Sequence, residues 1–177
     1  METPVVNFHS HVGSWAPIGD DDPDRYLHIM DCAGIDISCI NCIFHGDTRR
    51  GHDRVAWFVE QHPERYLGVA YANPHYPEET IAELERAFDQ LSMKFLKVYP
   101  DYFHRPVDDP AYFFIFDWIN ERDLAVMTHA TFPFDPPGTT IPGRFEALAV
   151  RFPRVKWVLA HEGANMREGS MEVARTI

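Results

Sequence analysis

Histidines occupy regular places in this 177-residue sequence, which contains ten of them. His9 and His11 form a His-x-His pair within an apolar run, and His129 and His161 end two later apolar runs. In an extended strand, residues i and i+2 point to the same face, so we expect the His9 and His11 side chains to project together. Neutral imidazole suits zinc and similar transition metals. The spacing predicts a metal site that starts from His9 and His11 and is completed by histidines from two other strands.

Lys97 and Glu162 are further candidates for chemistry. Lys97 lies between apolar residues in FLKVYP. It either reaches water at the end of a strand, supplies a charge for an acidic substrate, or forms a carbamylated metal ligand, and a lysine pKa lowered by burial would help either functional role. Glu162 directly follows His161 and is either a second acid/base group or the group that orients His161. The alternative for each single histidine is a plain hydrogen bond to a neighbouring loop.

Six short apolar runs alternate with segments of helical character. Prolines, acidic residues and Gly34 mark the helix ends, and Ile81, Leu84 and Phe88 show the three-four spacing of an amphipathic helix. The expected strands cover residues 5–11, 37–44, 66–71, 95–100, 124–129 and 155–161. The expected helices cover residues 22–34, 54–61, 77–90, 109–122 and 144–151, and a last helix begins near Ser170.

Strand followed by helix, repeated without a linker, indicates βαβ units and a parallel sheet. The expected strands begin about every 30 residues, which favours one repeated unit, as in a (β/α) TIM-type barrel. Eight such units need about 240 residues, so we expect residues 1–177 to form a single incomplete barrel domain with about six of the eight βα units. A doubly wound open sheet is the structural alternative. No GxGxxG follows the first run, and no GxxxxGK[ST] occurs.

Composition excludes several classes of protein. A net charge of −11 disfavours nucleic acid and anionic membranes as partners. No apolar run has the roughly 18 residues of a membrane helix, and the first residues lack the pattern of a signal peptide. Three cysteines cannot all pair, which favours a reducing, cytoplasmic setting. Cys39 and Cys42 would point to opposite faces of a strand, and we interpret all three cysteines as small apolar packing residues.

Aromatic residues follow several of the expected strand ends. They either wall a pocket for an apolar or aromatic substrate or anchor the loops. They are Trp15, Phe44, Tyr99, Tyr102, Phe103, Phe132 and Phe134. Residues 111–118 are too apolar for an exposed helix, so we expect them in the core, with part in a contact of a homo-oligomer.

The ordered set of motifs resembles the amidohydrolase superfamily. The motifs are NFHSH in the first run, FLKVYP in the fourth, MTHA in the fifth and LAHEG in the sixth. The branch that they resemble is the amidohydrolase-related group that includes aminocarboxymuconate-semialdehyde decarboxylase-like enzymes. The stretch VAWFVEQHPERYLGVAYANP is also similar to that group, and the resemblance spans the whole chain.

The resemblance implies a site and a class of reaction. His9, His11 and His129 would be metal ligands, His161 would be the general base or would polarise a metal-bound water, and Lys97 matches a lysine of this branch. The divalent metal would be zinc, with manganese or cobalt as alternatives. The small-molecule substrate would undergo hydrolysis of a C–N, C–O or C–C bond, or non-oxidative decarboxylation, through metal-activated water.

Two other functions remain open. The family's last essential residue is an aspartate after the eighth strand, and none of the aspartates of this chain fits that place. A non-catalytic, truncated barrel that serves as a binding or structural subunit is therefore the main alternative. The second is an open-sheet ligand binder, which requires that the first, fifth and sixth strands do not converge.

Overall fold

The computed structural model describes residues 3–13, 22–43, 47–130, 143–161 and 175. The chain packs as two compact units. The first comprises Met1–Tyr71 and Ala82–Lys94, and the second comprises Ala72–Ile81 and Phe95–Ile177. Parallel strands alternate with helices in both units, which confirms the α/β class. Among the helices described, none combines the length and the apolar character needed to cross a membrane.

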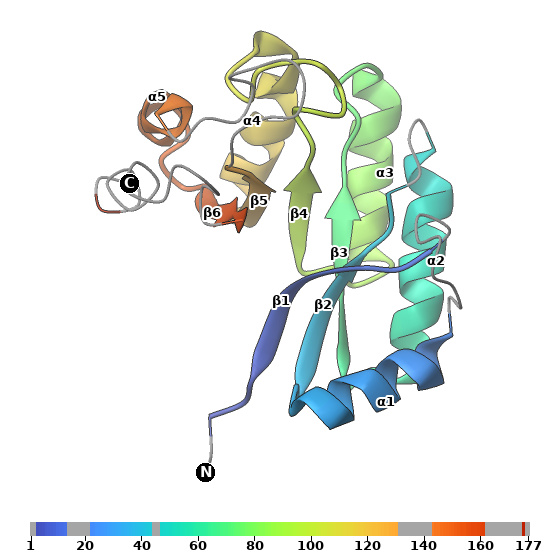
Figure 1. Cartoon of the computed structure of the whole chain (residues 1–177). Coiled ribbons are helices and arrows are strands. Elements are labelled where there is room, and N and C mark those ends of the chain that lie inside the picture. Colours follow the sequence, from blue (N-terminus) through green and yellow to red (C-terminus); the bar gives the residue numbers. More distant parts are fainter. Residues whose placement is uncertain (1–2, 14–21, 44–46, 131–142, 162–174, 176–177) are drawn as a thin grey trace. The chain divides into compact units, whose positions relative to one another are not determined.

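Each unit contains three of the six strands found in the described part of the chain. In the first unit β1, β2 and β3 pair in parallel, and in the second β4, β5 and β6 do so, each in chain order (Figure 1). The strands are β1 (Val6–His11), β2 (Ile37–Asn41), β3 (Tyr66–Tyr71), β4 (Phe95–Val98), β5 (Ala125–His129) and β6 (Lys156–Ala160). All six strands lie within the predicted runs. Strands can be located from local sequence because runs rich in β-branched residues are bounded by turn-forming residues.

The helices also follow the sequence pattern. Asp22 caps α1 by accepting hydrogen bonds from the backbone N–H groups of Asp24 and Arg25, and Gly34 ends this helix at a φ of 68°. The helix α2 starts at Thr48, six residues before its predicted start at residue 54. The Asp47 side chain caps it by accepting a hydrogen bond from the Arg50 N–H. The helices are α1 (Pro23–Ala33), α2 (Thr48–Gln61), α3 (Pro77–Asp89), α4 (Phe113–Glu121) and α5 (Arg144–Arg151), with a 3-10 turn η1 (Pro110–Tyr112). The helix predicted from Ser170 lies outside the described residues.

In the first unit, α2 packs closely on β3 because β3 carries a glycine. A Cβ atom on Gly68 would lie 3.2 Å from Val55 Cγ1 and 3.3 Å from Met93 Cγ, so a larger residue would press on both side chains. Phe58 and Tyr66 fill the space beside it, with ring centroids 5.6 Å apart, and both are buried. The small residue thus sets the distance between helix and strand.

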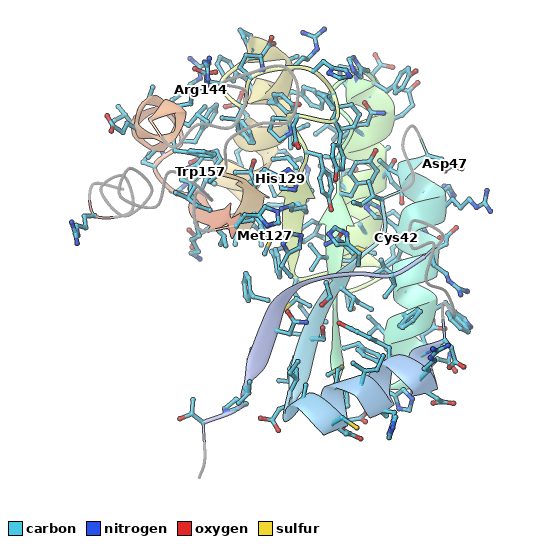
Figure 2. All side chains as sticks on the ribbon, in the orientation of Figure 1. Cys42, Asp47, Met127, His129, Arg144 and Trp157 are labelled. Atoms are coloured by element: carbon cyan, nitrogen blue, oxygen red, sulfur yellow. The ribbon has the colours of Figure 1, made fainter. Side chains whose placement is uncertain are left out.

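The core of the second unit is aromatic. Phe116 of α4 lies edge to face with Trp157 of β6 at 5.0 Å and with Phe152 at 5.6 Å. Phe145 of α5 reaches the same tryptophan, at 5.9 Å. Figure 2 shows Trp157 on β6 together with Met127 and His129 on β5. The apolar stretch 111–118 therefore lies largely in the core, as predicted, since Ile115, Phe116 and Trp118 are buried.

Candidate active site

Chemically active side chains meet at the carboxyl ends of the three strands of the second unit. Lys97 is the third residue of β4, His129 ends β5, and His161 directly follows β6. In the parallel register, Lys97 pairs with Met127, and His129 pairs with Ala160. The carboxyl ends of barrel strands are where TIM-barrel enzymes place their active sites. The structure therefore brings three of the predicted residues to one end of one sheet.

His129 is held by a carboxylate that sequence reasoning did not single out. Its Nδ1 lies 2.8 Å from Oδ1 and 2.9 Å from Oδ2 of Asp101, and both side chains are buried. A carboxylate can only accept, so Nδ1 carries the hydrogen and Nε2 of the neutral ring is left as the basic nitrogen. Burial lowers the pKa of His129. The hydrogen bond to Asp101 raises this pKa, but it does not outweigh the effect of burial. Asp101 thus fixes the tautomer and the orientation of the ring.

Lys97 is completely buried, so the alternative in which it reaches water at the end of a strand is wrong. Its side chain is 0% exposed, and among the described residues its Nζ has no hydrogen-bond partner. The Nζ lies 5.3 Å from the centre of the Tyr99 ring. Burial lowers the pKa of Lys97 to about 7, and the charge of Asp101 opposes this shift. Near neutral pH, an amine with this pKa is present in both its protonated and its unprotonated form.

Burial and neighbouring charges also tune the other two groups. Burial raises the pKa of Asp101, but the hydrogen bond and charge of His129 outweigh it, so this pKa is lower than usual. The His161 ring lies 4.8 Å from the His129 ring. Desolvation and the charges of His129 and Lys97 lower the pKa of His161. His161 is accordingly a neutral base at pH 7, and it is more exposed than His129.

Two tyrosines brace the His129 ring. Tyr99 and Tyr102 stack with centroids 5.2 Å apart, and the His129 ring stands perpendicular to both, at 5.4 and 5.7 Å. Tyr99 is buried and Phe103 contacts His75 at 5.5 Å, so these aromatic residues anchor the segment after β4. The other aromatic candidates for a pocket wall, Trp15, Phe44, Phe132 and Phe134, lie outside the described residues, as does Glu162.

His9 and His11 lie together in the first unit. Their ring centroids are 4.9 Å apart with planes at 60°, as expected for a His-x-His pair at the end of a strand. The ladder between β1 and β2 shifts register between Asn7 and Ser10, so the pair sits beside a β-bulge. The pair and the Lys97–Asp101–His129–His161 group belong to different compact units.

The donor atoms have the chemistry that a divalent transition metal prefers. His9 and His11 offer imidazole nitrogens in the first unit, and His129 offers one in the second. A carboxylate that orients a histidine, as Asp101 does, is typical of a metal-bound histidine. Within the described ranges, no group of three or more His, Cys, Asp or Glu side chains could by itself hold a metal ion. The residues present fit such a metal in type.

One expectation about other residues is wrong, because Cys32, interpreted as an apolar packing residue, is exposed. His52 is buried, with 1% of its surface exposed. Its Nδ1 lies 2.8 Å from Glu83 Oε1, and its Nε2 accepts from the Tyr71 N–H. No local pattern reveals this, because the partners are distant in sequence. Cys32 is exposed and lies 3.7 Å from His28, whereas Cys39 and Cys42 are buried as predicted; all three are free thiols.

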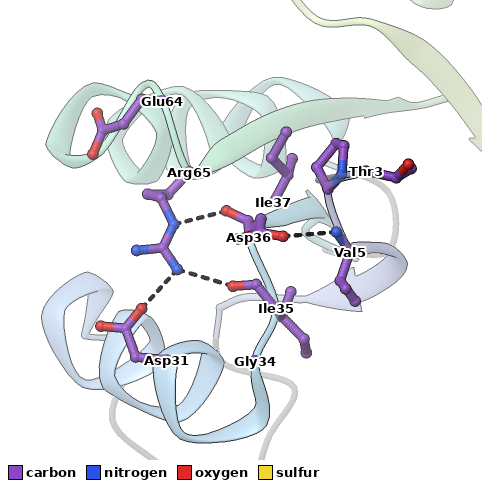
Figure 3. A pocket seen from close by; sticks show the side chains of 10 residues that line it. Thr3, Val5, Asp31, Gly34, Ile35, Asp36, Ile37, Glu64 and Arg65 are labelled. Carbon is purple, nitrogen blue, oxygen red and sulfur yellow. Dashed lines mark hydrogen bonds and ion pairs between the residues drawn. The ribbon is translucent and has the colours of Figure 1, made fainter. Parts of the chain in front are cut away.

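A cavity of about 1040 Å³ lies at the opposite, amino-terminal end of the strands of the first unit (Figure 3). Arg65 crosses it and donates to the carbonyls of Ile35 and Asp36 and to the carboxylate of Asp31, at 2.7 to 2.9 Å. The Asp36 carboxylate accepts from the Val5 N–H at 2.7 Å. These bonds tie α1, β2 and β3 together, which is a stabilising role typical of this end of a barrel.

The sequence model of the amidohydrolase family matches residues 42–175. None of the curated proteins compared with the chain matches it. Among solved structures, a 2,6-dihydroxybenzoate decarboxylase from Rhizobium has a TM-score of 0.72 at 17% identity, covering 94% of this chain and 69% of its own. A dihydroxybenzoic acid decarboxylase from Polaromonas, solved with manganese and an inhibitor, has a TM-score of 0.71 at 16% identity. The match covers 94% of this chain and 68% of the decarboxylase chain.

A TIM-barrel protein from Bordetella bronchiseptica is similar as well. Its TM-score is 0.73 at 17% identity, covering 88% of this chain and 57% of its own. At sequence identities of 16 to 17%, the similarity to these structures concerns the fold alone. It confirms the barrel-type fold that the spacing of the strands predicted. The family match confirms the resemblance over residues 42–175, which include the FLKVYP, MTHA and LAHEG motifs. The decarboxylases among the similar structures agree with the predicted branch.

Proposed function

Because the chain belongs to the amidohydrolase family, we propose that it is a metal-dependent enzyme acting on a small molecule. The reaction is hydrolysis of a C–N, C–O or C–C bond or non-oxidative decarboxylation. The observation that carries this proposal is the group of Lys97, Asp101, His129 and His161 at the carboxyl ends of β4, β5 and β6. That group has a basic imidazole, a carboxylate-anchored imidazole and a buried amine at the end of the strands where barrel enzymes work.

His9, His11 and His129 are the ligands in this proposal. A divalent metal bound there, zinc or alternatively manganese or cobalt, would polarise a substrate oxygen and lower the pKa of a bound water. The type of the donors supports this assignment, as does the hydrogen bond from His129 Nδ1 to Asp101, which leaves Nε2 as the ligating nitrogen. The manganese in the Polaromonas decarboxylase supports a divalent ion of this kind.

The remaining residues move protons and place charge. His161, neutral because its pKa is lowered, accepts a proton at a ring nitrogen from the attacking water or from the substrate. Lys97, when protonated, places a positive charge in a water-poor setting, where it attracts an anionic group such as a carboxylate. Asp101 keeps the His129 ring in one tautomer throughout.

An acidic small molecule is the substrate class that these groups favour. The net charge of −11 disfavours nucleic acid as a partner. The positive charge that Lys97 carries when protonated is therefore a local exception in an acidic chain. Decarboxylases among the similar structures support an aromatic carboxylate as the first substrate to test. A cytoplasmic setting and a homo-oligomer remain our proposals, and the three free thiols support the first of them.

Metal analysis of the purified protein tests the proposal. We expect one equivalent of zinc, manganese or cobalt per chain, lost in His9→Ala and in His11→Ala and retained in His28→Ala, which removes an exposed histidine of α1. His161→Ala should keep the metal and lose turnover of aromatic carboxylates, lactones or amides. A metal-replete wild type that binds no divalent ion would contradict the proposal, and bound metal without turnover on any of these substrates would favour the non-catalytic alternative.

The hydrogen bond between Asp101 and His129 provides a second test. Asp101→Asn leaves the ring without its carboxylate, and we expect metal affinity to fall about 10- to 100-fold, as for other carboxylates that orient a metal-bound histidine. Competition with a chromophoric chelator measures this. Asp109→Asn, which alters a carboxylate that caps the η1 turn, is the control and should bind metal like the wild type.

A further inference from the structure

The strand that carries His9 and His11 is irregular at the point where the pair begins. From Asn7 to Ser10 the strand β1 advances three residues, whereas its partner β2 advances two, from Ser38 to Ile40. One extra residue is thus accommodated around His9. A bulge of this kind changes where the following side chains point, and bulges are frequent beside active sites.

Four polar side chains converge on this bulge. Tyr26 of α1 donates its hydroxyl hydrogen to Ser10 Oγ at 2.6 Å and lies 3.0 Å from Ser38 Oγ. The two serine oxygens are 3.2 Å apart. We call this group the Tyr26 cluster, and its members are Asn7, Ser10, Tyr26 and Ser38.

The amide of Asn7 connects the cluster to the histidine pair. Its Nδ2 donates to Ser10 Oγ and, at 3.4 Å, to the Tyr26 hydroxyl. Its Oδ1 accepts from the backbone N–H of His9, also at 3.4 Å. The Asn7 side chain therefore bonds to the backbone of the bulge, to Ser10 on the same strand and to Tyr26 of α1.

The anchor of the cluster is itself fixed. The Tyr26 ring stacks on Tyr66 with centroids 5.9 Å apart and planes at 14°. The Tyr66 ring is fully buried, so the surface against which Tyr26 stacks is fixed. Ser38 is also completely buried. A bulge bonded to such rigid neighbours has one backbone conformation rather than several.

We propose that the Tyr26 cluster positions His9 and His11, by locking the β1 bulge so that the two imidazoles stay 4.9 Å apart as a preformed pair of metal donors. This inference rests on the proposed function, because it assigns the metal to the pair. Asn7, Ser10, Tyr26 and Ser38 are positioning residues here, since they act through the backbone of β1 and not on the metal.

Removal of one hydroxyl tests the cluster. Tyr26→Phe keeps the ring and its stack on Tyr66 but deletes the bonds to β1 and β2. We expect about tenfold weaker binding of Zn²⁺ and Mn²⁺, measured by chelator competition on protein shown to be folded by circular dichroism. Ser38→Ala removes a different member of the cluster and should weaken binding in the same direction.

The chain offers a matched control in the same pair of tyrosines. Tyr66→Phe deletes a hydroxyl that bonds to Pro23 and not to β1, so it should lower the free energy of unfolding while metal affinity stays within about twofold of the wild type. If Tyr26→Phe and Ser38→Ala both bind metal as tightly as Tyr66→Phe does, the cluster is purely structural and the inference is overturned.

A metal-free measurement separates this inference from the proposed function. In the wild-type apoprotein, NMR should show cross-relaxation between the ring protons of His9 and His11 and slow exchange of the His9 amide hydrogen. Tyr26→Phe should weaken the first and speed the second, and Tyr66→Phe should change neither. If the wild type binds no metal, or if His9→Ala retains the metal, the proposed function fails. In that case the NMR result alone decides whether the Tyr26 cluster orders the His9–His11 pair.

Discussion

Glu83 shows at the scale of a residue how a buried charge is kept ionised. Its carboxylate lies 2.8 Å from His52 Nδ1 and accepts from Arg86 Nη2 at 2.7 Å, and its side chain is 8% exposed. Burial raises the pKa of Glu83, but the hydrogen bonds and charges of His52 and Arg86 outweigh it and lower this pKa to about 2. The ordinary value of a glutamate in an unfolded chain is about 4.3. The carboxylate therefore stabilises the folded state only while it is ionised.

The first prediction is a loss of stability in acid that depends on Glu83. Its folded pKa is depressed, so its contribution is complete above the unfolded pKa and disappears as the pH falls toward 2. Glu83→Gln should lower the free energy of unfolding by about 2 kcal/mol at pH 7, and this difference should shrink between pH 5 and pH 3. Urea unfolding at several pH values measures it. Glu85→Gln, an exposed site on the same helix, is the control, and a pH-independent difference for Glu83→Gln would contradict the linkage.

At the scale of an element, α1 matters because it carries Tyr26. The helix begins where Asp22 accepts from the N–H groups of Asp24 and Arg25, at 2.9 and 3.2 Å, and Pro23 occupies its first turn. Such a cap satisfies backbone donors that have no partner within the helix. Sequence patterns suffice to place this helix, because the cap, the proline and Gly34 are all local signals.

The second prediction concerns this cap. Asp22→Ala should lower the free energy of unfolding by about 1 kcal/mol, because two N–H groups lose their acceptor. Asp22→Asn should retain nearly all the stability, since an asparagine side-chain oxygen also accepts at this position. Chemical denaturation of both variants makes the comparison. Equal losses in the two variants would mean that charge, rather than the hydrogen bonds, stabilises the start of α1.

At the scale of the whole molecule, the proposed metal links ligand binding to stability. A metal that binds the folded state alone adds about 2.7 kcal/mol to the free energy of unfolding at 100 times its Kd. The third prediction is that zinc or manganese, added to EDTA-treated protein, raises Tm, and that the double variant His9→Ala/His11→Ala shows no such rise. Differential scanning calorimetry at fixed protein concentration measures this. A similar rise in the double variant would place the stabilising metal elsewhere.

The sequence by itself determined the type and order of the elements and most of the residues of the candidate site. Strand periodicity, helix caps and the repeat of about 30 residues are local signals, and they placed His9, His11, His129 and His161 at the ends of strands. The amidohydrolase motifs are likewise short and ordered along the chain. Such features are readable because each depends on residues close together in sequence.

The tertiary structure alone decided which residues are paired and which are buried. Asp101 meets His129 across 28 residues, and His52 meets Glu83 across 31. The complete burial of Lys97 and the bulge beside His9 are also long-range outcomes, since each depends on what neighbouring strands and helices cover. Contacts between residues far apart in sequence form only when the chain folds, so no local pattern records them. These contacts are what set the tautomer of His129, lower the pKa of Lys97 and hold the His9–His11 pair in place.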